Sequence, residues 1–485
     1  MRRVALALAV VALALPAGAT GSARFVPTDP LAAKQWYLAP IHAFDFWADL
    51  PTTLASVRVA VVDSGLDVDH PEFAGRVALT ESFVGGDVTD REGHGTFVAG
   101  IIAAALGNGQ GIAGIAFPAQ LLVAKVVRAD GTISPEAEAK AIRWAADHGA
   151  RVINLSLGGL RDPLKKFEDT YSAAEQDAIS YAYSKGAVVV AAVGNADQAP
   201  KRPWLYASYP AALPHVLGVS ALAQDGSVPG FSNRDSFYND ISAPGVGIVS
   251  TLPRALTAPR ATCLDQGYSL CGPSEFRSAE GTSYAAAQVS AAAALLIAVR
   301  PTLDPGQVTT LLERSAADVD AASGCKQCPP LRDLYSGWGQ LDVSAALNAL
   351  GGPIPTRDRY EGNDDAGTRA FTLWGRSIDI TATLDFWDDQ IDVYRVKLEQ
   401  GQTAAVSLRG PAGTDTNLVL WRPGTTQVEG LATGVQTRRV TQSTRVGPNE
   451  HFLHRAAETG WYYVEVKLTT PGSGSYHLHI SKSKL

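Results

Sequence analysis

The stretch Val59-Ala60-Val61-Val62-Asp63-Ser64-Gly65 joins a short apolar run to an acid and a glycine. Four consecutive apolar residues without alternation predict a strand that is buried on both faces. The glycine permits a tight turn directly afterwards, so we expect Asp63 at the carboxyl end of this strand. In open α/β sheets, ligands bind beyond the carboxyl ends of the strands. Asp63 is therefore a candidate functional residue of an α/β fold.

Similar apolar runs recur along the chain and alternate with helical segments. Ser134-Pro135-Glu136 supplies an N-cap, a proline at the first helical position and an acid near the positive end of the helix dipole. Strands that alternate with helices predict a parallel sheet with right-handed crossovers and helices on both faces. The expected strands are 57–62, 121–127, 151–155, 188–193 and 216–220, and the expected helices are 97–106, 137–148, 171–185, 306–317 and one that begins near Ser283 and ends before Pro301.

The composition is that of a globular protein with an acidic surface. The chain has 485 residues, 46% of them apolar and 18% charged, and a formal net charge of −7. An acidic surface repels phosphate backbones, so we expect no nucleic-acid partner. The length suggests about two or three domains, and we take two as the first estimate.

The amino terminus predicts export. Arg2 and Arg3 precede an apolar run that ends at Pro16, and Ala17-Gly18-Ala19 follows. This pattern is typical of a signal peptide, because the run is too short to span a bilayer. We expect cleavage after Ala19, with Ala23 as the alternative site, and a secreted bacterial protein with no membrane segment afterwards.

The four cysteines form two close pairs, and export to an oxidising compartment favours disulfides within the pairs. Zinc is the alternative, because Cys325-Lys326-Gln327-Cys328 has a spacing found among zinc ligands. No histidine lies near either pair, which argues against zinc. The disulfide candidates are Cys263, Cys271, Cys325 and Cys328.

The pattern changes after residue 350. Residues 351–358 contain glycines and prolines and predict a linker, and the region 359–485 shows period-two alternation, as at Tyr462, Val464 and Val466. We therefore expect a second domain that is an all-β, jelly-roll-like sandwich. The acids Asp385, Asp388, Asp389 and Asp392 could hold a cation there, but we expect them to form a solvated turn.

Two more segments supply the partners that Asp63 needs for nucleophilic catalysis. His94 lies between two glycines, and Ser283 lies at the start of an alanine-rich helix. A serine hydroxyl attacks only when a base removes its proton, and the base needs an acid that holds its tautomer. Asp63, His94 and Ser283 therefore predict a catalytic triad.

The segments Asp63-Ser64-Gly65, His94-Gly95-Thr96 and Gly281-Thr282-Ser283 resemble the subtilisin-like serine proteases, or subtilases, and occur in that family's order. The resemblance covers about residues 29–350. It implies a subtilisin-like parallel sheet flanked by helices, a monomer that cleaves polypeptides through an acyl-enzyme, and no cofactor for catalysis. It also implies that Asn195 stabilises the oxyanion and that Asn154–Gly159 is an edge strand whose Ser156, Leu157 and Gly158 contact substrate.

The same resemblance implies a structural Ca²⁺ site formed by Asp29, Glu72 and Asn108, with carbonyl groups of the loop 106–112. Residues 20–28 form only a short extension before the catalytic region, fewer residues than the inhibitory prodomain of many subtilases. Residues 359–485 resemble the prepeptidase C-terminal domains of secreted bacterial hydrolases, through Glu361-Gly362-Asn363-Asp364 and Gly460-Trp461-Tyr462-Tyr463-Val464.

Two other functions remain open. A catalytically impaired, subtilase-like binding protein or adhesin would use the β-sandwich instead, and an intact triad with Asn195 argues against it. A lipase or esterase would need a Gly-x-Ser-x-Gly elbow, which does not surround Ser283.

Overall fold

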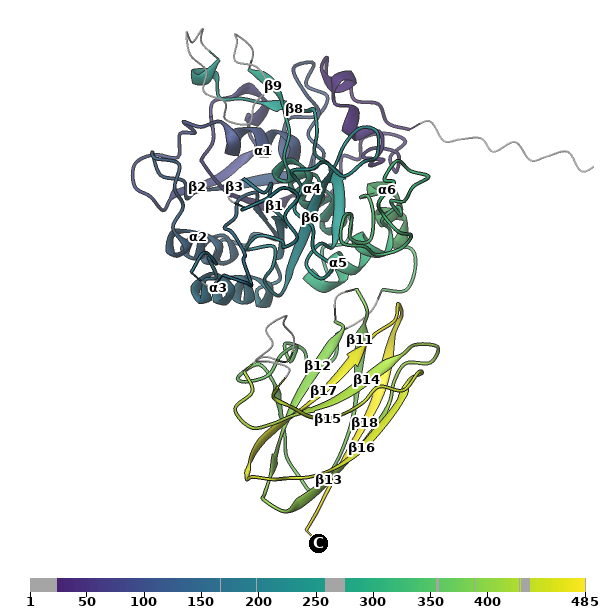
Figure 1. The fold of residues 1–485 in the computed structure, drawn as a ribbon. Coiled ribbons are helices and arrows are strands. Elements are labelled where there is room, and N and C mark those ends of the chain that lie inside the picture. Colours follow the sequence, from purple (N-terminus) through teal and green to yellow (C-terminus); the bar gives the residue numbers. More distant parts are fainter. Residues whose placement is uncertain are drawn as a thin grey trace, which may run out of the picture.

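The computed structural model describes residues 24–484 except 166, 198, 258–274, 355–356, 388, 427 and 429–436. The expected signal peptide and the pair Cys263 and Cys271 lie outside these residues. Figure 1 shows two bodies, an α/β body from the amino-terminal part of the chain and a β-rich body from the carboxyl-terminal part.

The α/β body contains a seven-stranded parallel sheet in the order β2-β3-β1-β4-β5-β6-β7. This confirms the predicted fold class. Two edge strands, β2 and β7, were not predicted from the sequence. The strands of this body are β1 (Val57–Asp63), β2 (Val77–Ser82), β3 (Ala119–Lys125), β4 (Val152–Leu155), β5 (Val188–Ala192), β6 (Val216–Leu222), β7 (Ile241–Pro244), and a separate antiparallel pair, β8 (Ile248–Thr251) and β9 (Phe276–Ala279).

Helices cover both faces of the sheet and divide the core in two. One core packs α1, α4, α5 and α6 against side chains such as Val59 and Val190, and the other packs α2 and α3 against their neighbours Ala60 and Val189. Successive residues of a strand point to opposite faces, which explains this division. The helices are α1 (His94–Ala103), α2 (Pro135–Asp147), α3 (Ala173–Ser184), α4 (Thr282–Val299), α5 (Pro305–Arg314) and α6 (Val343–Ala349).

Helix α4 runs through the centre of the first core. Within the part of the chain that the structure describes, it alone has the length and apolar composition that could cross a membrane, and 94% of it is buried inside the protein. It contacts β4, β5 and β6 as well as α1. These contacts identify α4 as the central helix of the core.

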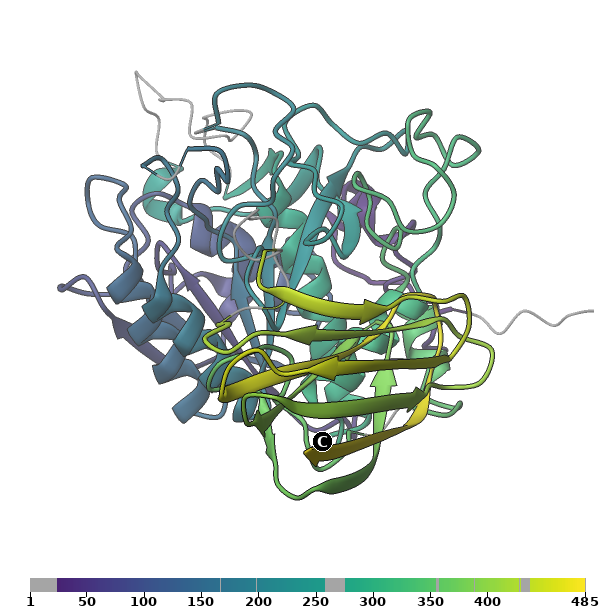
Figure 2. The ribbon, with the colours of Figure 1, turned by 60° about the horizontal axis from the view of Figure 1, so that its bottom comes forward.

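The second body is a sandwich of two sheets, as predicted (Figure 2). One sheet has the order β10-β12-β17-β14-β15, the other has the order β11-β18-β13-β16, and a single apolar core lies between them. In the described part of this body, the paired strands run antiparallel except for β10 with β12. The strands are β10 (Phe371–Leu373), β11 (Ser377–Asp385), β12 (Ile391–Leu398), β13 (Gln402–Arg409), β14 (Thr416–Trp421), β15 (Arg439–Ser443), β16 (Asn449–Arg455), β17 (Gly460–Leu468) and β18 (Ser473–Lys484).

The two bodies touch through the end of the sandwich that carries the β11–β12 turn. Thr310 Oγ1 of α5 donates a hydrogen bond to Asp385 Oδ1 at 3.2 Å. The guanidinium of Arg314 lies 5.1 Å from the ring centroid of Trp387. The junction therefore combines polar contacts with aromatic contacts beside α5.

Candidate active site

The candidate catalytic residues gather at the carboxyl edge of the sheet. Strands β1, β4 and β5 are neighbours and run in parallel, so that Asp63 and the residues that follow β4 and β5 meet at one edge. Helix α1 begins at His94 rather than at the expected Phe97, and α4 begins at Thr282, directly before Ser283. The fold thus brings residues 63, 94 and 283 to one side of the sheet.

Asp63 and His94 form a close, partly buried pair. His94 Nδ1 lies 2.8 Å from Asp63 Oδ1 and 2.9 Å from Oδ2, and the Asp63 side chain is 2% exposed. Burial opposes the charged form of His94, but the charge and hydrogen bond of Asp63, with the charges of Asp90 and Glu92, outweigh it and raise the pKa of His94. The contact orients the imidazole with its second nitrogen directed away from Asp63.

Asp90 is an important residue that the sequence analysis missed. Its carboxylate accepts hydrogen bonds from the backbone N–H groups of Gly93 and Thr96 and from the hydroxyls of Ser64 and Thr96, at 2.7 to 2.9 Å. Ser64 Oγ in turn accepts the Gly95 N–H at 2.9 Å. These bonds fix the first turn of α1, and with it His94, against the end of β1. An acid four residues before the histidine, next to a helix start, was the available sequence signal.

Ser283 lies in the first turn of α4 and is 8% exposed. Its hydroxyl donates a hydrogen bond to the Ser156 carbonyl oxygen at 3.0 Å, and the Ser156 hydroxyl donates to the Ser283 carbonyl oxygen at 2.8 Å. Among the hydrogen bonds of the described residues, none joins Ser283 to His94. The His94 ring packs against the next side chain, Tyr284, with ring centroids 5.8 Å apart.

Asn195 follows β5 and faces the start of α4. Its Oδ1 accepts hydrogen bonds from the Thr282 N–H at 2.9 Å and the Thr282 hydroxyl at 2.8 Å. Because the oxygen is held by Thr282, the Nδ2 group is the end of the amide that can donate to a substrate. Gly194 has φ +101, a backbone conformation that favours glycine. Thr282 is thus a second positioning residue that the sequence reasoning did not name.

A pocket of about 150 Å³ opens beside Ser283. Ser156, Leu157 and Gly158 line one part of it, and Asn195 lines another. The expectation that Asn154–Gly159 forms an edge strand is wrong for its first half, because β4 lies between β1 and β5 in the middle of the sheet. Residues 156–158 follow the end of β4 and line the pocket.

The residues expected to bind calcium also meet. Asp29 accepts the Gly107 N–H at 2.9 Å and the Asn108 N–H at 3.2 Å, and Glu72 accepts from Asn108 Nδ2 at 3.2 Å and from the Ile112 N–H at 3.1 Å. Burial raises the pKa of Glu72 to about 7, and the charge of Asp29 adds to this. Two buried carboxylates beside a loop of carbonyl groups fit a hard cation.

One expected cysteine pair is joined. Cys325 and Cys328 form a disulfide with a Cα–Cα distance of 5.4 Å, and both residues are buried against Leu222 and Val228. This arrangement contradicts the zinc alternative for this pair.

Comparisons with known proteins agree with the fold. Residues 55–339 match the family model of the subtilase family. Thermitase from Thermoactinomyces vulgaris is 37% identical over 238 residues, which are 48% of this chain and 78% of that protein. Subtilisin DY from Bacillus licheniformis is 32% identical over 299 residues, 60% of this chain and 91% of that protein. A protease structure from Pseudoalteromonas arctica aligns with a TM-score of 0.53 and 25% identity, over 67% of this chain and 99% of that one.

The parallel sheet and the matched region define a peptidase of the subtilisin-like class. The chain belongs to the subtilase family and is a subtilisin-like serine endopeptidase.

Proposed function

We propose that this endopeptidase cleaves peptide bonds with Ser283 as nucleophile, His94 as general base and Asp63 as the acid that orients His94. The contact between Asp63 and His94 at 2.8 Å is the observation that carries this assignment. Rotation about the Cα–Cβ bond of Ser283 moves its Oγ away from the Ser156 carbonyl oxygen, to which it donates in the free enzyme. Such rearrangement is common, because catalytic hydrogen bonds tighten when substrate binds.

In this mechanism, His94 takes the Ser283 proton as Oγ attacks the scissile carbonyl carbon. Asp63 stabilises the imidazolium, and Asn195 Nδ2 donates to the oxyanion together with the backbone N–H of Ser283. His94 then protonates the leaving amine, and water hydrolyses the acyl-enzyme by the reverse proton route. Thr282 supports this role of Asn195, because it holds the amide oxygen and directs the nitrogen toward the pocket.

The substrate is an extended polypeptide. Its backbone pairs with residues 156–158 as an added strand, and the side chain before the scissile bond enters the pocket beside Ser283. The pocket volume of about 150 Å³ and its wall of small residues accommodate one side chain.

The location and organisation of the enzyme are part of the proposal. The first 19 residues direct secretion, and the mature protein is a monomer with a catalytic domain at 29–350, a linker at 351–358 and a β-sandwich at 359–485. Asp29, Glu72 and Asn108 hold a structural Ca²⁺, which offsets the two buried carboxylates at that loop. Catalysis itself uses no metal, because the side chains at the site supply the nucleophile, the base and the oxyanion donor.

The test compares wild type with Ser283→Ala in casein hydrolysis and in labelling by a fluorophosphonate probe. We expect kcat to fall by about 10⁶-fold, the loss known for the serine of subtilisin itself. Ser278→Ala, which changes a serine of β9 outside the pocket, is the matched control and should keep its activity. Equal hydrolysis by wild type and Ser283→Ala would end the assignment. An unlabelled, correctly folded wild type would favour the binding-protein alternative.

A further inference from the structure

The disulfide between Cys325 and Cys328 lies inside the catalytic domain rather than at its surface. The two cysteines are 1% and 4% exposed. They pack in a small apolar group of their own, separate from the two large cores of this domain. We call this group the disulfide cluster, and its residues are Leu222, Val228, Val319, Cys325 and Cys328, with the half-buried Tyr335 packed against them.

The cluster holds the loop that follows β6, because Val228 of this loop packs against the two cysteines. The loop also touches the backbone of the segment that carries the disulfide. A Cβ atom on Gly226 would lie 1.9 Å from the Ser323 carbonyl oxygen, and one on Gly324 would lie 1.9 Å from the Asp225 carbonyl oxygen. A disulfide restricts the conformations of the segment that it closes, so it fixes one side of this backbone contact.

The same region holds the far end of the loop. The guanidinium of Arg234 lies 4.8 Å from the ring centroid of Tyr335, and the Asp235 N–H donates a hydrogen bond to the Leu334 carbonyl oxygen at 3.0 Å. Tyr335 in turn packs against the disulfide cluster. Residues 228–235, which we call the buttress segment, are therefore held at both ends by the region around the disulfide.

Asn233 of the buttress segment forms part of the pocket beside Ser283. It is 1% exposed and lines this pocket together with Gly194 and Ser208. Its N–H donates to the Gly194 carbonyl oxygen at 2.9 Å, and its Nδ2 donates to the Val193 carbonyl oxygen at 2.9 Å and to Ser208 Oγ at 3.2 Å. A Cβ atom on Gly194 would lie 2.6 Å from this Nδ2, so the packing is tight and a shift of Asn233 moves a wall of the pocket.

The oxyanion donor has a separate support. Asn195 Oδ1 accepts hydrogen bonds from the N–H and the hydroxyl of Thr282, which belongs to α4. A shift of the buttress segment therefore alters the pocket while the contact that directs Asn195 stays in place. Loss of a contact that the substrate makes equally in the bound state and in the transition state raises KM and leaves kcat unchanged.

We propose that Cys325 and Cys328 are positioning residues for substrate selectivity, because their disulfide keeps Asn233 in the pocket wall through the buttress segment. This inference rests on the proposed function, since it takes the pocket as the site of the side chain before the scissile bond. A dithiol breaks the disulfide by thiol–disulfide exchange: both cysteine sulfurs become thiols, and the dithiol gives up two hydrogens and closes to a cyclic disulfide. The reduced chain keeps its catalytic residues but binds a large side chain more weakly.

The experiment uses the full chain with Cys263→Ser and Cys271→Ser, so that the bond between Cys325 and Cys328 is the only one that dithiothreitol can reduce. Its kcat and KM are measured before and after reduction with two peptides that differ only in a Leu or an Ala before the scissile bond. One methylene in an apolar pocket is worth about tenfold or more, so we expect the KM of the Leu peptide to rise about fivefold to tenfold. The KM of the Ala peptide and both kcat values should stay within about twofold.

Three variants locate the effect. Cys325→Ala with Cys328→Ala should reproduce the reduced protein and should not respond to dithiothreitol. Gly226→Ala disturbs the backbone contact with Ser323 while the disulfide stays intact, and it should raise the KM of the Leu peptide in the same way. Leu347→Ala, the control, removes a buried side chain of α6 and lowers stability, but it should leave the ratio of the two KM values unchanged.

Equal changes in the KM of both peptides, or no change in either, would overturn the proposal, since a merely structural bond does not distinguish the two side chains. If the buried bond resists dithiothreitol, the Cys325→Ala, Cys328→Ala variant gives the answer, and if that variant does not fold, Gly226→Ala gives it. Activity that persists in Ser283→Ala would instead refute the proposed function, so the two failures are distinguishable.

Discussion

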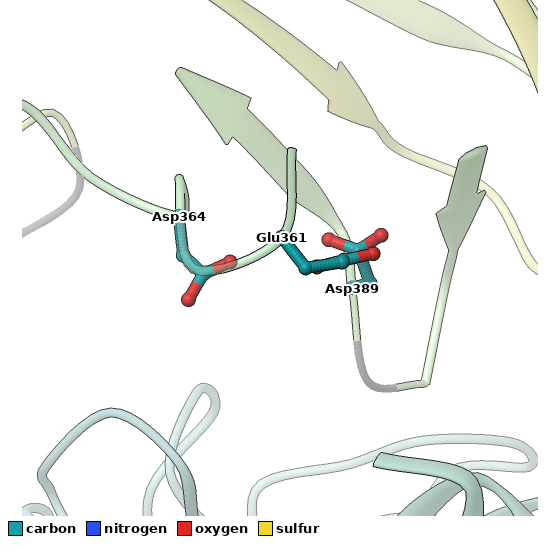
Figure 3. Close-up of side chains that lie close together, drawn as sticks. All are labelled: Glu361, Asp364 and Asp389. Carbon is teal, nitrogen blue, oxygen red and sulfur yellow. The ribbon is translucent and has the colours of Figure 1, made fainter. Parts of the chain in front are cut away.

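Two groups of acids, one buried at the active site and one half-buried at the junction of the two bodies, differ in how the neighbouring groups balance their charge. At the active site, Asp63 is paired with His94, and Asp90 accepts hydrogen bonds from three backbone N–H groups and two hydroxyls. At the junction, Glu361 and Asp389 lie beside other acids (Figure 3), and burial raises their pKa values. Hydrogen-bond donors and an imidazole balance the charge of the first group, whereas burial favours the protonated form of the acids in the second.

The difference shows that burial alone does not decide what an acid does. A carboxylate that receives several N–H donors remains ionised and can anchor a helix or orient an imidazole. A carboxylate that faces other carboxylates becomes neutral or recruits a cation. The donors around each acid therefore decide whether it stays charged.

Removal of the acid that orients the imidazole should have the largest effect. In Asp63→Asn the amide can donate to His94 and stabilise the wrong tautomer, and we expect kcat to fall by about 10⁴-fold. Peptide hydrolysis at pH 8 measures it. Asp67→Asn, at a nearby acid that pairs with Arg254, is the control and should stay within about tenfold of wild type. Equal losses in the two variants would mean that the Asp63–His94 contact has no special role.

The next effect concerns the helix anchor. Asp90→Ala leaves several buried donors without an acceptor, and we expect the free energy of unfolding to fall by about 3–5 kcal/mol, measured by denaturant unfolding of the Ser283→Ala chain. Asp87→Ala removes an exposed acid of the same loop, whose carboxylate accepts the Thr89 N–H and pairs with the exposed Arg91, and should lower the free energy of unfolding far less than Asp90→Ala does. A loss below 1 kcal/mol in Asp90→Ala would contradict the assigned anchoring role.

A further pair of acids, Glu138 and Glu175, lies between two helices and tests the same rule. Glu138 of α2 and Glu175 of α3 are 5% and 4% exposed, and burial, followed by the charge of Glu175, raises the pKa of Glu138 well above its usual range. The folded chain then keeps a proton that the unfolded chain loses, so stability declines as pH rises from the unfolded pKa of about 4.3 through the folded pKa.

We expect Glu138→Gln, which cannot ionise, to remove this decline. At pH 9 its Tm should exceed that of the parent protein by about 2–4 °C, the shift that ~1 kcal/mol produces in a large domain. Calorimetry of Ser283→Ala proteins between pH 5 and pH 9 measures the change. Glu136→Gln, at an exposed position of the same helix turn, should reproduce the parent curve, and the rule fails if both variants behave alike.

The smallest effect is a shift in the pH profile. Glu92 raises the pKa of His94 by its charge, together with Asp63 and Asp90. His94 must be neutral to act as base, so kcat/KM should rise as pH rises through a His94 pKa that lies above the ordinary 6.5. Glu92→Gln removes one negative charge, and we expect the rising limb to move to lower pH while the plateau stays within about twofold. A shift to higher pH would contradict the electrostatic account.

Much of the fold could be predicted from the sequence because buried strands and helix caps leave local signals. The apolar run before Asp63 and the Ser134-Pro135 cap predicted β1 and α2 to within a few residues. The edge strands gave weaker signals. Most of β2 is exposed, and β7 has only four residues and ends at Pro244, so neither shows a long apolar run.

The site was only partly visible in the sequence for a similar reason. The contact between Asp63 and His94 follows from residue types and chain order, and the structure brings both to the same edge. Thr282 and Asp90 act through bonds to Asn195 and to the turn before α1, which depend on tertiary packing. Asp385 and Asp392, which the sequence suggested would lie in a solvated turn, are buried, and this was missed because Thr310 and Tyr476, which contact them, are distant in sequence.

Helix α4 has a consequence for when the enzyme becomes active. Ser283 lies in the first turn of a helix whose buried residues contact strands on either side of the sheet centre. When only part of the sheet has formed, α4 lacks some of the strands that it packs against. The apolar residues of α4 then cannot hold Ser283 beside His94. Proteolytic activity therefore requires the assembled core, and we expect its recovery during refolding to follow the packing of α4 on the sheet.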